Sequence, residues 1–324
     1  MPSNNQFLSS VKMVSPEVKV FVLHPGEHKK YFELIHRSCM IFLNIPGMDL
    51  HVEDLNTPNL LRKKLRRTID ISEGKTVLDL NQYSDAPRGI SSLYGSFTSL
   101  YARAKIGDLI IVPNRGYFEP FLLGEIISDF NEEDLLSIYS NEFPTPCRKV
   151  RWLPQKKSKC QISESLSNQM SNRKAIIEIN ENKLIKEVLS LAYGKYIYND
   201  SSKSYFSGST YNSSNLQGII DALTAINELS RTIDPDTPID IKINFNSPGG
   251  ICITSGGRKA IFIAALISSC LAGCDYDDVQ NEYRLVSEDD VYCNSIMASL
   301  DSNTYRSICA KANSAKDQIN FEVE

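Results

Sequence analysis

The first half of the chain contains short apolar runs with the spacing of β-strands. Val18, Val20 and Val22 alternate with other residues, and the pair Pro25-Gly26 follows them. A spacing of two places these side chains on one face of an extended chain, which Pro-Gly then ends. Comparable apolar runs, bounded by turn residues, occupy 109–112, 121–127, 147–153 and 175–179. These runs predict a sheet in the first half of the chain.

Helical spacing is found between and after the predicted strands. Ile162, Leu166 and Met170 recur every four residues, and the strongly basic segment 59–69 also has a helical pattern. The second half has helical patterns at 182–194, 216–230 and 259–274. One predicted strand, 237–244, lies between the second and third of these helices. Two polar or Gly-rich segments, 199–215 and 247–259, are expected to form a loop and a turn.

These patterns predict an α+β protein in three parts. Residues 1–17 are polar and expected to be flexible. Residues 18–181 are expected to form a domain with a sheet, either a plain β-meander or a small barrel, and packed helices. Residues 182–324 are expected to form a mainly helical α/β domain that serves interaction or effector functions.

Composition limits the functions that fit this chain. It has 324 residues and a formal net charge of −4, so two domains are expected and any nucleic-acid surface has to be a local patch. The eight Cys include no CxxC pair, and the four His lie within residues 24–51. These spacings predict no metal site and no cofactor. We expect reduced thiols in a cytoplasmic protein.

One uncharged segment, 260–274, raises the question of a membrane. It is shorter than the roughly 20 residues that a spanning helix requires. We therefore predict no membrane span and a core helix at 259–274, and we also consider this helix as a contact for a homo-oligomer or a defence-system partner. The N-terminal residues lack the basic and apolar stretches of a secretory signal.

Residues 18–181 resemble the PUA-like, EVE-related domain at the N-terminus of Mrr-type restriction endonucleases. The resemblance lies in six stretches that follow one another in order, "VFVLHPGEHKKYFELI", "MIFLNIPG", "SSLYGSFTSLYARAKIGDLIIVP", "LLGEIISDF", "CRKVRWL" and "SLSNQMSNRKAIIEI". It implies a PUA-like β-barrel domain with packed helices, in which a curled sheet forms a cleft that holds a base or nucleotide. It also implies a nucleic-acid-binding component, with DNA as the expected ligand, of a bacterial anti-phage defence or restriction system. The recognised base would be modified or flipped out of its stack.

Several residues in these stretches are candidates for contacting a base. Trp152 could stack on a base or lie at the rim of the core. Tyr94 and Phe97 have helical spacing, which also suits a core. Gly26 lets the backbone approach a ligand closely. Asp108 could accept a hydrogen bond from a base edge or cap the turn before its strand.

Two clusters of basic residues are candidates for phosphate contact. The first lies in the predicted basic helix and consists of Arg62, Lys63, Lys64, Arg66 and Arg67. The second consists of Arg148, Lys149 and Arg151, with Lys156, Lys157 and Lys159 after them. Charge runs also occur simply as solvated faces. Each phosphate contacted would increase the salt dependence of binding.

Two alternatives to a reader remain open. Proteins with this N-terminal domain usually carry a PD-(D/E)xK nuclease, and the nearest match here is Asp221, Asp240 and Lys242, which would act with Mg²⁺. Asp221 falls inside a predicted helix, which is a poor context for that site. The Gly-rich segment 247–259 lacks the phosphate-binding spacings. The other alternative is a scaffold or nucleotide-signal sensor that does not bind nucleic acid.

Overall fold

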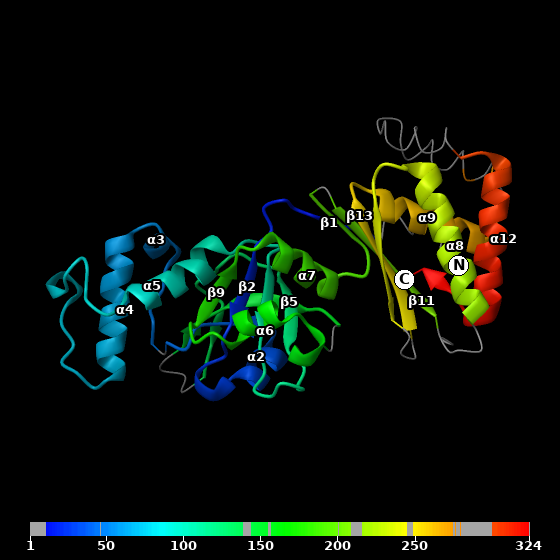
Figure 1. Cartoon of the computed structure of the whole chain (residues 1–324). Coiled ribbons are helices and arrows are strands. Elements are labelled where there is room, and N and C mark those ends of the chain that lie inside the picture. Colours follow the sequence, from blue (N-terminus) through cyan, green and yellow to red (C-terminus); the bar gives the residue numbers. More distant parts are fainter. Residues whose placement is uncertain are drawn as a thin grey trace. The chain divides into compact units, whose positions relative to one another are not determined.

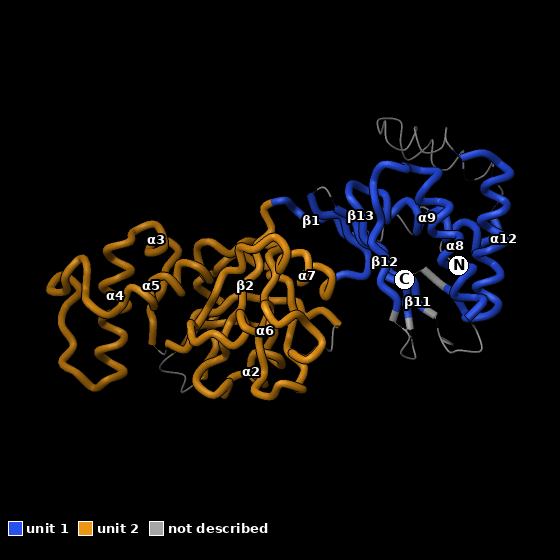
Figure 2. Tube along the Cα trace, viewed as in Figure 1, with its two compact units in different colours: residues 1–16, 193–324 blue, residues 17–192 orange. Residues whose placement is uncertain are grey.

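The chain folds into two compact units in a computed structural model (Figures 1 and 2). We call residues 17–192 the central unit, and residues 1–16 with 193–324 the terminal unit. The structure describes residues 11–45, 47–138, 144–154, 157–199, 201–208, 216–244, 249–274, 276, 279 and 300–323. Both units combine helices with a sheet, so the predicted α+β class is confirmed at this level.

The central unit is built on a curled, half-barrel sheet in the order β3-β8-β5-β4-β2-β9. Its strands are β2 (Val20–Leu23), β3 (Met40–Ile41), β4 (Leu109–Val112), β5 (Leu122–Ile126), β8 (Arg148–Trp152) and β9 (Ile176–Ile179). Strands β2 and β4 are parallel, and the other neighbours are antiparallel. Every residue of β2 and β4 is buried, because side chains cover both faces of the sheet there.

Helices pack on this sheet and extend beyond it (Figure 1). They are α2 (Phe32–Ser38), α3 (Val52–Leu55), α4 (Pro58–Ser72), α5 (Ser91–Phe97), the π-helical segment η3 (Thr98–Arg103), α6 (Glu164–Ser171) and α7 (Asn182–Ala192). Short 3-10 turns are η1 (Glu27–Lys29), η2 (Leu80–Gln82) and η4 (Lys159–Gln161), and β6 (Leu135–Leu136) pairs with β7 (Thr145–Pro146). The predicted helices at 59–69 and 162–170 correspond to α4 and α6.

The terminal unit has a second sheet, in the order β1-β10-β11-β13-β12, with β14 paired to β11. Its strands are β1 (Lys12–Val14), β10 (Tyr196–Tyr198), β11 (Ser201–Gly208), β12 (Ile239–Asn244), β13 (Gly249–Gly256) and β14 (Glu322–Val323). The helices α8 (Leu216–Ile233), α9 (Lys259–Ala272) and α12 (Ser302–Ile319) pack against it. The described helices of this unit hold more residues than its strands, as expected for a mainly helical α/β domain. The sheet is larger than predicted, since β11 lies where we expected a loop and β13 where we expected a turn.

Helix α9 forms the centre of the terminal unit. Its apolar side chains, including Phe262, Leu266 and Ile267, are buried among α8, α12 and the sheet. The prediction of a core helix is therefore confirmed. Because these side chains are already covered within one chain, α9 leaves no apolar face for the oligomer contact that we considered. Among the described residues, no helix is both long and apolar enough to cross a bilayer.

The unit boundaries differ from the sequence-based ones. Residues 1–10 lie outside the described residues, but Lys12–Val14 form strand β1, parallel to β10, so the end of segment 1–17 is not a free tail. Helix α7 belongs to the central unit, which extends to 192 rather than 181. Glu187 of α7 accepts hydrogen bonds from the backbone N and Oγ of Ser163, at 2.7 and 2.6 Å. These bonds fix α7 to the start of α6.

Candidate functional site

Four segments of the central unit meet at one edge of its sheet. Val22 of β2 pairs with Ile111 of the parallel strand β4, so both strands end at this edge. The antiparallel partners place the start of β5, the end of β8 and the start of β9 there as well. We call the connecting segments 24–31, 113–121, 157–161 and 172–175 the basic edge. They contain seven Lys or Arg residues and two Glu, although the whole chain carries a net charge of −4.

The segment 24–31 has an unusual backbone. Gly26, His28 and Lys29 have φ values of 75°, 51° and 57°, in the left-handed region. For residues other than Gly, this conformation costs about 1–2 kcal/mol each. Hydrogen bonds inside the segment compensate, including Tyr31 N to Pro25 O at 3.0 Å. Strained backbone that the surroundings hold in place is typical of functional sites.

This backbone conformation turns Lys29 back over His24. The Lys29 ammonium donates a hydrogen bond to His24 Nδ1. His24 Nε2 must then carry the proton of the neutral ring, yet this atom is buried and has no partner. A buried donor without a partner costs about 1–3 kcal/mol. An acceptor on a ligand would remove that cost.

Lys159 completes this cluster from the segment after β8. The side chain is only 9% exposed, and its Nζ donates to the carbonyl oxygen of Asn114 at 3.2 Å. Within the described part of the chain, neither Lys29 nor Lys159 forms a salt bridge with a carboxylate. Two partly buried ammonium groups thus lie close together without a salt bridge to either of them among the described residues.

The pKa values of the three groups reflect this arrangement. Burial, together with the charges of Lys29 and Lys159, lowers the pKa of His24 to about 4. Burial and the charge of Lys159 lower the pKa of Lys29 to about 8. Burial also lowers the pKa of Lys159, although Glu119 opposes this. A ligand with negative charge would relieve all three groups.

Of the second basic cluster, only part faces solvent. Arg148 is fully buried, and its guanidinium donates to the carbonyl oxygens of Leu100, Ala104 and Ser128 at 2.6–2.9 Å. It links β8 to η3 and has no exposed surface for a phosphate, so it is not part of the candidate surface. The next two basic residues are paired, Lys149 with Asp134 at 2.7 Å and Arg151 with Glu125 at 2.8 Å. Lys156 lies outside the described residues.

The basic helix α4 is largely neutralised by acidic side chains. Lys63 pairs with Asp85 at 2.8 Å, and Arg66 pairs with Asp70 at 2.6 Å. Arg67 is exposed. The guanidinium of Arg62 lies 4.5 Å from the centre of the Tyr94 ring. The charge run therefore supplies less free positive charge than its composition indicates.

The aromatic candidates take part in packing. Trp152 lies across from Gly124 on the neighbouring strand, and its Nε1 donates to the carbonyl oxygen of His36 at 3.1 Å. A Cβ on Gly124 would lie 2.6 Å from the Trp152 ring, so this glycine makes room for the indole. Phe97 is buried against Tyr101, with ring centres 5.1 Å apart. Phe97 is not available for a base, whereas Trp152 remains half-buried at the rim of the core.

Asp108 caps the turn before β4. It is buried and accepts hydrogen bonds from the backbone N of Lys19 at 2.8 Å and of Lys105 at 2.7 Å. Burial raises its pKa, and these two bonds oppose that effect. Both carboxylate oxygens of Asp108 accept hydrogen bonds from backbone N–H groups, as expected for the turn cap rather than for a contact with a base edge.

The structure does not bring the nuclease residues together. Asp221 of α8 accepts a hydrogen bond from Ser314 of α12 at 2.6 Å. Asp240 and Lys242 of β12 alternate with Ile239 and Ile241, which pack toward the helices, and so lie on the other face of the sheet. Among the described residues, no group of three or more His, Cys, Asp or Glu is arranged to hold a metal ion.

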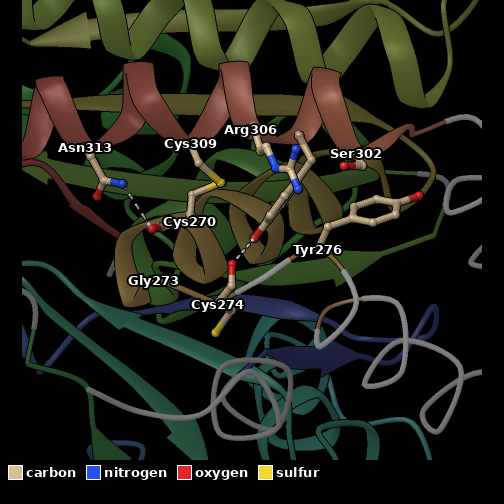
Figure 3. A pocket seen from close by; sticks show the side chains of 9 residues that line it. Cys270, Gly273, Cys274, Tyr276, Ser302, Arg306, Cys309 and Asn313 are labelled. Atoms are coloured by element: carbon tan, nitrogen blue, oxygen red, sulfur yellow. Dashed lines mark hydrogen bonds between the residues drawn. A yellow bond between two sulfur atoms is a disulfide. The ribbon is translucent and has the colours of Figure 1, made fainter.

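The terminal unit has a pocket of about 430 Å³ beside a disulfide (Figure 3). Cys270 of α9 is bonded to Cys309 of α12, which corrects the expectation that all eight Cys are reduced. Asn313 donates to the carbonyl oxygen of Cys270 at 3.4 Å, and Tyr305 donates to that of Cys274 at 3.3 Å. The polar groups at the end of α9 are thus bonded to α12 rather than directed at a ligand.

Sequence reasoning placed Gly26 and Lys159 at the candidate surface but missed His24 and Lys29. The available signal was the "HPGEHKK" turn directly after a buried strand, in which two histidines and two lysines lie around Pro-Gly. The remaining cations come from segments far apart in sequence, which the strand order β8-β5-β4-β2-β9 unites. Comparison with family models, with curated proteins and with solved structures gives no match for this chain.

Proposed function

We propose that the central unit binds nucleic acid at the basic edge, with DNA as the first ligand to test. The protein would serve as a reader of a modified or flipped base in a bacterial anti-phage defence or restriction system. The defence context and the type of base come from the resemblance of residues 18–181 to the PUA-like domain of Mrr-type restriction endonucleases. The proposal that the ligand is a polyanion does not depend on this resemblance, because the positive charges of the basic edge support it independently.

The observation that carries the proposal is the cluster of His24, Lys29 and Lys159. Two desolvated ammonium groups lie beside a buried ring donor that lacks a partner. Clustered like charges destabilise the folded chain unless an anion neutralises them. A phosphate group would neutralise the lysines, and its oxygen would accept the His24 Nε2 proton.

The flanking residues extend the positive surface. Arg173 and Lys174 precede β9 and are exposed, while the backbone N of His24 donates to Ala175 O at 2.8 Å. This bond fixes the segment 172–175 beside His24. Several separate cations along one edge match the repeated charges of a nucleic-acid backbone better than a single small anion.

The test is binding of the full chain to labelled single-stranded and duplex DNA and RNA, plain and base-modified, over a salt series. Lys29→Gln with Lys159→Gln should weaken binding to all sequences and reduce the slope of log K against log salt by about 2. A control with Lys105→Gln and Lys183→Gln alters two exposed lysines of the same unit and should change binding much less.

Three results would decide the question. Absence of binding to every nucleic acid at low salt would refute the proposal and favour the scaffold or nucleotide-sensor alternative. Equal losses in the two double variants would show general electrostatic attraction rather than a site. Preference for one modified ligand would identify the base that is read.

A further inference from the structure

The connection between β4 and β5 presents two aromatic rings to solvent at the basic edge. Tyr117 is 55% exposed and Phe118 is 79% exposed. Among the described residues, no other large hydrophobic side chain is as exposed as Phe118. An aromatic ring exposed to this extent forgoes about 1.5–3 kcal/mol of burial free energy, which a partner that covers the ring would recover.

These rings are held on a fixed turn. The backbone N of Gly116 donates to Glu119 Oε2 at 2.8 Å, which closes the turn around Tyr117 and Phe118. On one side, Arg115 Nε donates to the carbonyl oxygen of His28. On the other side, Pro120 forms a β-bridge with Ser158. The turn is therefore anchored to both of the neighbouring segments that supply His24, Lys29 and Lys159.

The geometry of the rings limits what they can hold. Their centres lie 5.3 Å apart and their planes are perpendicular, at 90°. A planar ligand can lie parallel to only one of the two rings. The more exposed ring, that of Phe118, is the one with space for it, and the Tyr117 ring supports it edge to face.

Charge indicates which part of a nucleic acid would meet these rings. The carboxylate of Glu119 lies within the turn and repels phosphates, whereas Lys29 and Lys159 attract them. A strand whose phosphates lie on the lysines would therefore turn a base, not its backbone, toward Phe118. A base inside a matched duplex does not expose its face, but an unpaired base does.

We infer that Phe118 stacks on an unpaired base of the nucleic acid bound at the basic edge. This inference rests on the proposed function and deepens it, because it names the ligand class as single-stranded or locally unpaired nucleic acid. The protein would then prefer a single strand, or a duplex with one unpaired base, over a matched duplex of the same sequence.

The experiment compares the full chain with Phe118→Ala, Phe118→Leu and Phe118→Tyr variants. The probes are a single strand, a matched duplex and a duplex with one unpaired 2-aminopurine, read by affinity and by 2-aminopurine fluorescence. Ile106→Ala serves as the control, because Ile106 is 58% exposed and precedes β4 at the opposite edge of the sheet.

Phe118→Ala should weaken binding to the single strand by about 5- to 150-fold, which corresponds to 1–3 kcal/mol per stacked base. The slope against salt should stay unchanged, because no phosphate contact is lost. Phe118→Tyr should retain binding and the fluorescence quenching of 2-aminopurine, whereas Phe118→Leu should lose both, and Ile106→Ala should behave as the unaltered chain.

The two proposals fail in different ways. If the unaltered chain binds no nucleic acid, the proposed function is wrong and the inference falls with it. If binding occurs but Phe118→Ala leaves affinity and quenching intact, only the inference is overturned. Full affinity and quenching in Phe118→Leu would likewise overturn it, since an aliphatic side chain offers no stacking face. Circular dichroism of each variant would show that the exposed substitutions leave the fold unchanged.

Discussion

Proton uptake on ligand binding is the sharpest consequence of the His24–Lys29–Lys159 cluster. In the free protein the pKa of Lys29 is about 8, because of burial and the charge of Lys159. A bound phosphate would stabilise the ammonium form and return its pKa toward the ordinary value of 10.5. Binding should therefore take up a proton wherever free Lys29 is partly deprotonated.

The expected stoichiometry follows from these two pKa values. At pH 7, free Lys29 is about nine-tenths protonated, so binding takes up about 0.1 proton. Uptake rises to about 0.5 proton at pH 8 and to about 0.9 proton at pH 9. Because proton uptake is the slope of log affinity against pH, affinity should fall about sevenfold between pH 9 and pH 10.

Isothermal titration calorimetry of a short oligonucleotide at pH 7, 8 and 9 measures this uptake, using buffers of different ionisation enthalpy. The change in apparent enthalpy with buffer gives the number of protons bound. Lys29→Gln should remove most of the uptake, leaving only the contribution of Lys159, and Lys183→Gln should retain it. An uptake below about 0.1 proton at pH 8, or one that is undiminished in Lys29→Gln, would refute the assignment to Lys29.

Further predictions concern stability. The pKa of His24 is lowered from 6.5 to about 4 in the folded protein. Its contribution to the free energy of unfolding is therefore complete above pH 6.5, and up to about 3 kcal/mol is lost as the pH falls toward 4. Denaturant titrations should show a weaker loss of stability over this pH range in His24→Gln. Arg148→Met should cost about 3 kcal/mol or more by leaving three buried carbonyl groups without their donor, and an unchanged urea midpoint would contradict that role. Gly124→Ala should lower the free energy of unfolding by about 1–3 kcal/mol, because the added methyl group meets the Trp152 ring. A thermal melt should show this as a lower midpoint. Cys309→Ser, or a reducing agent, should destabilise the terminal unit by about 4 kcal/mol, since the disulfide with Cys270 spans 39 residues; no shift in unfolding on reduction would speak against the disulfide.

Sequence periodicity predicted the central unit better than the terminal unit. The strands β2, β4, β5, β8 and β9 and the helices α4 and α6 follow apolar patterns that need no knowledge of partners. Strand β11 was missed because the residues that face the helices include Ser202 and Ser204, a composition typical of loops. The hydroxyl oxygens of Ser202 and Ser255 accept hydrogen bonds from the backbone N of Ala260, at 3.2 and 2.8 Å. These buried hydroxyl groups therefore satisfy a backbone donor in the first turn of α9.

The candidate site shows a different limit of sequence reasoning. A run such as 62–67 is conspicuous in sequence, yet Asp54, Asp70 and Asp85 neutralise most of it through pairings that a charge count does not show. The basic edge has the opposite character. Its cations are sparse along the chain, and the parallel pairing of β2 with β4 gathers them. Arg148 likewise follows the alternation of β8 into the core, where a charge is not expected.

The place of β1 has a consequence for the order in which the chain folds. Because Lys12–Val14 pair with Tyr196–Tyr198, the terminal unit is assembled from both ends of the chain, and residues 17–192 form an insertion within it. During synthesis the central unit can fold as soon as it leaves the ribosome. The β1 segment cannot pair with β10 until residue 198 has been synthesised, so the terminal unit is completed last. Removal of residues 11–16 should therefore leave the central unit folded while it deprives the terminal sheet of an edge strand.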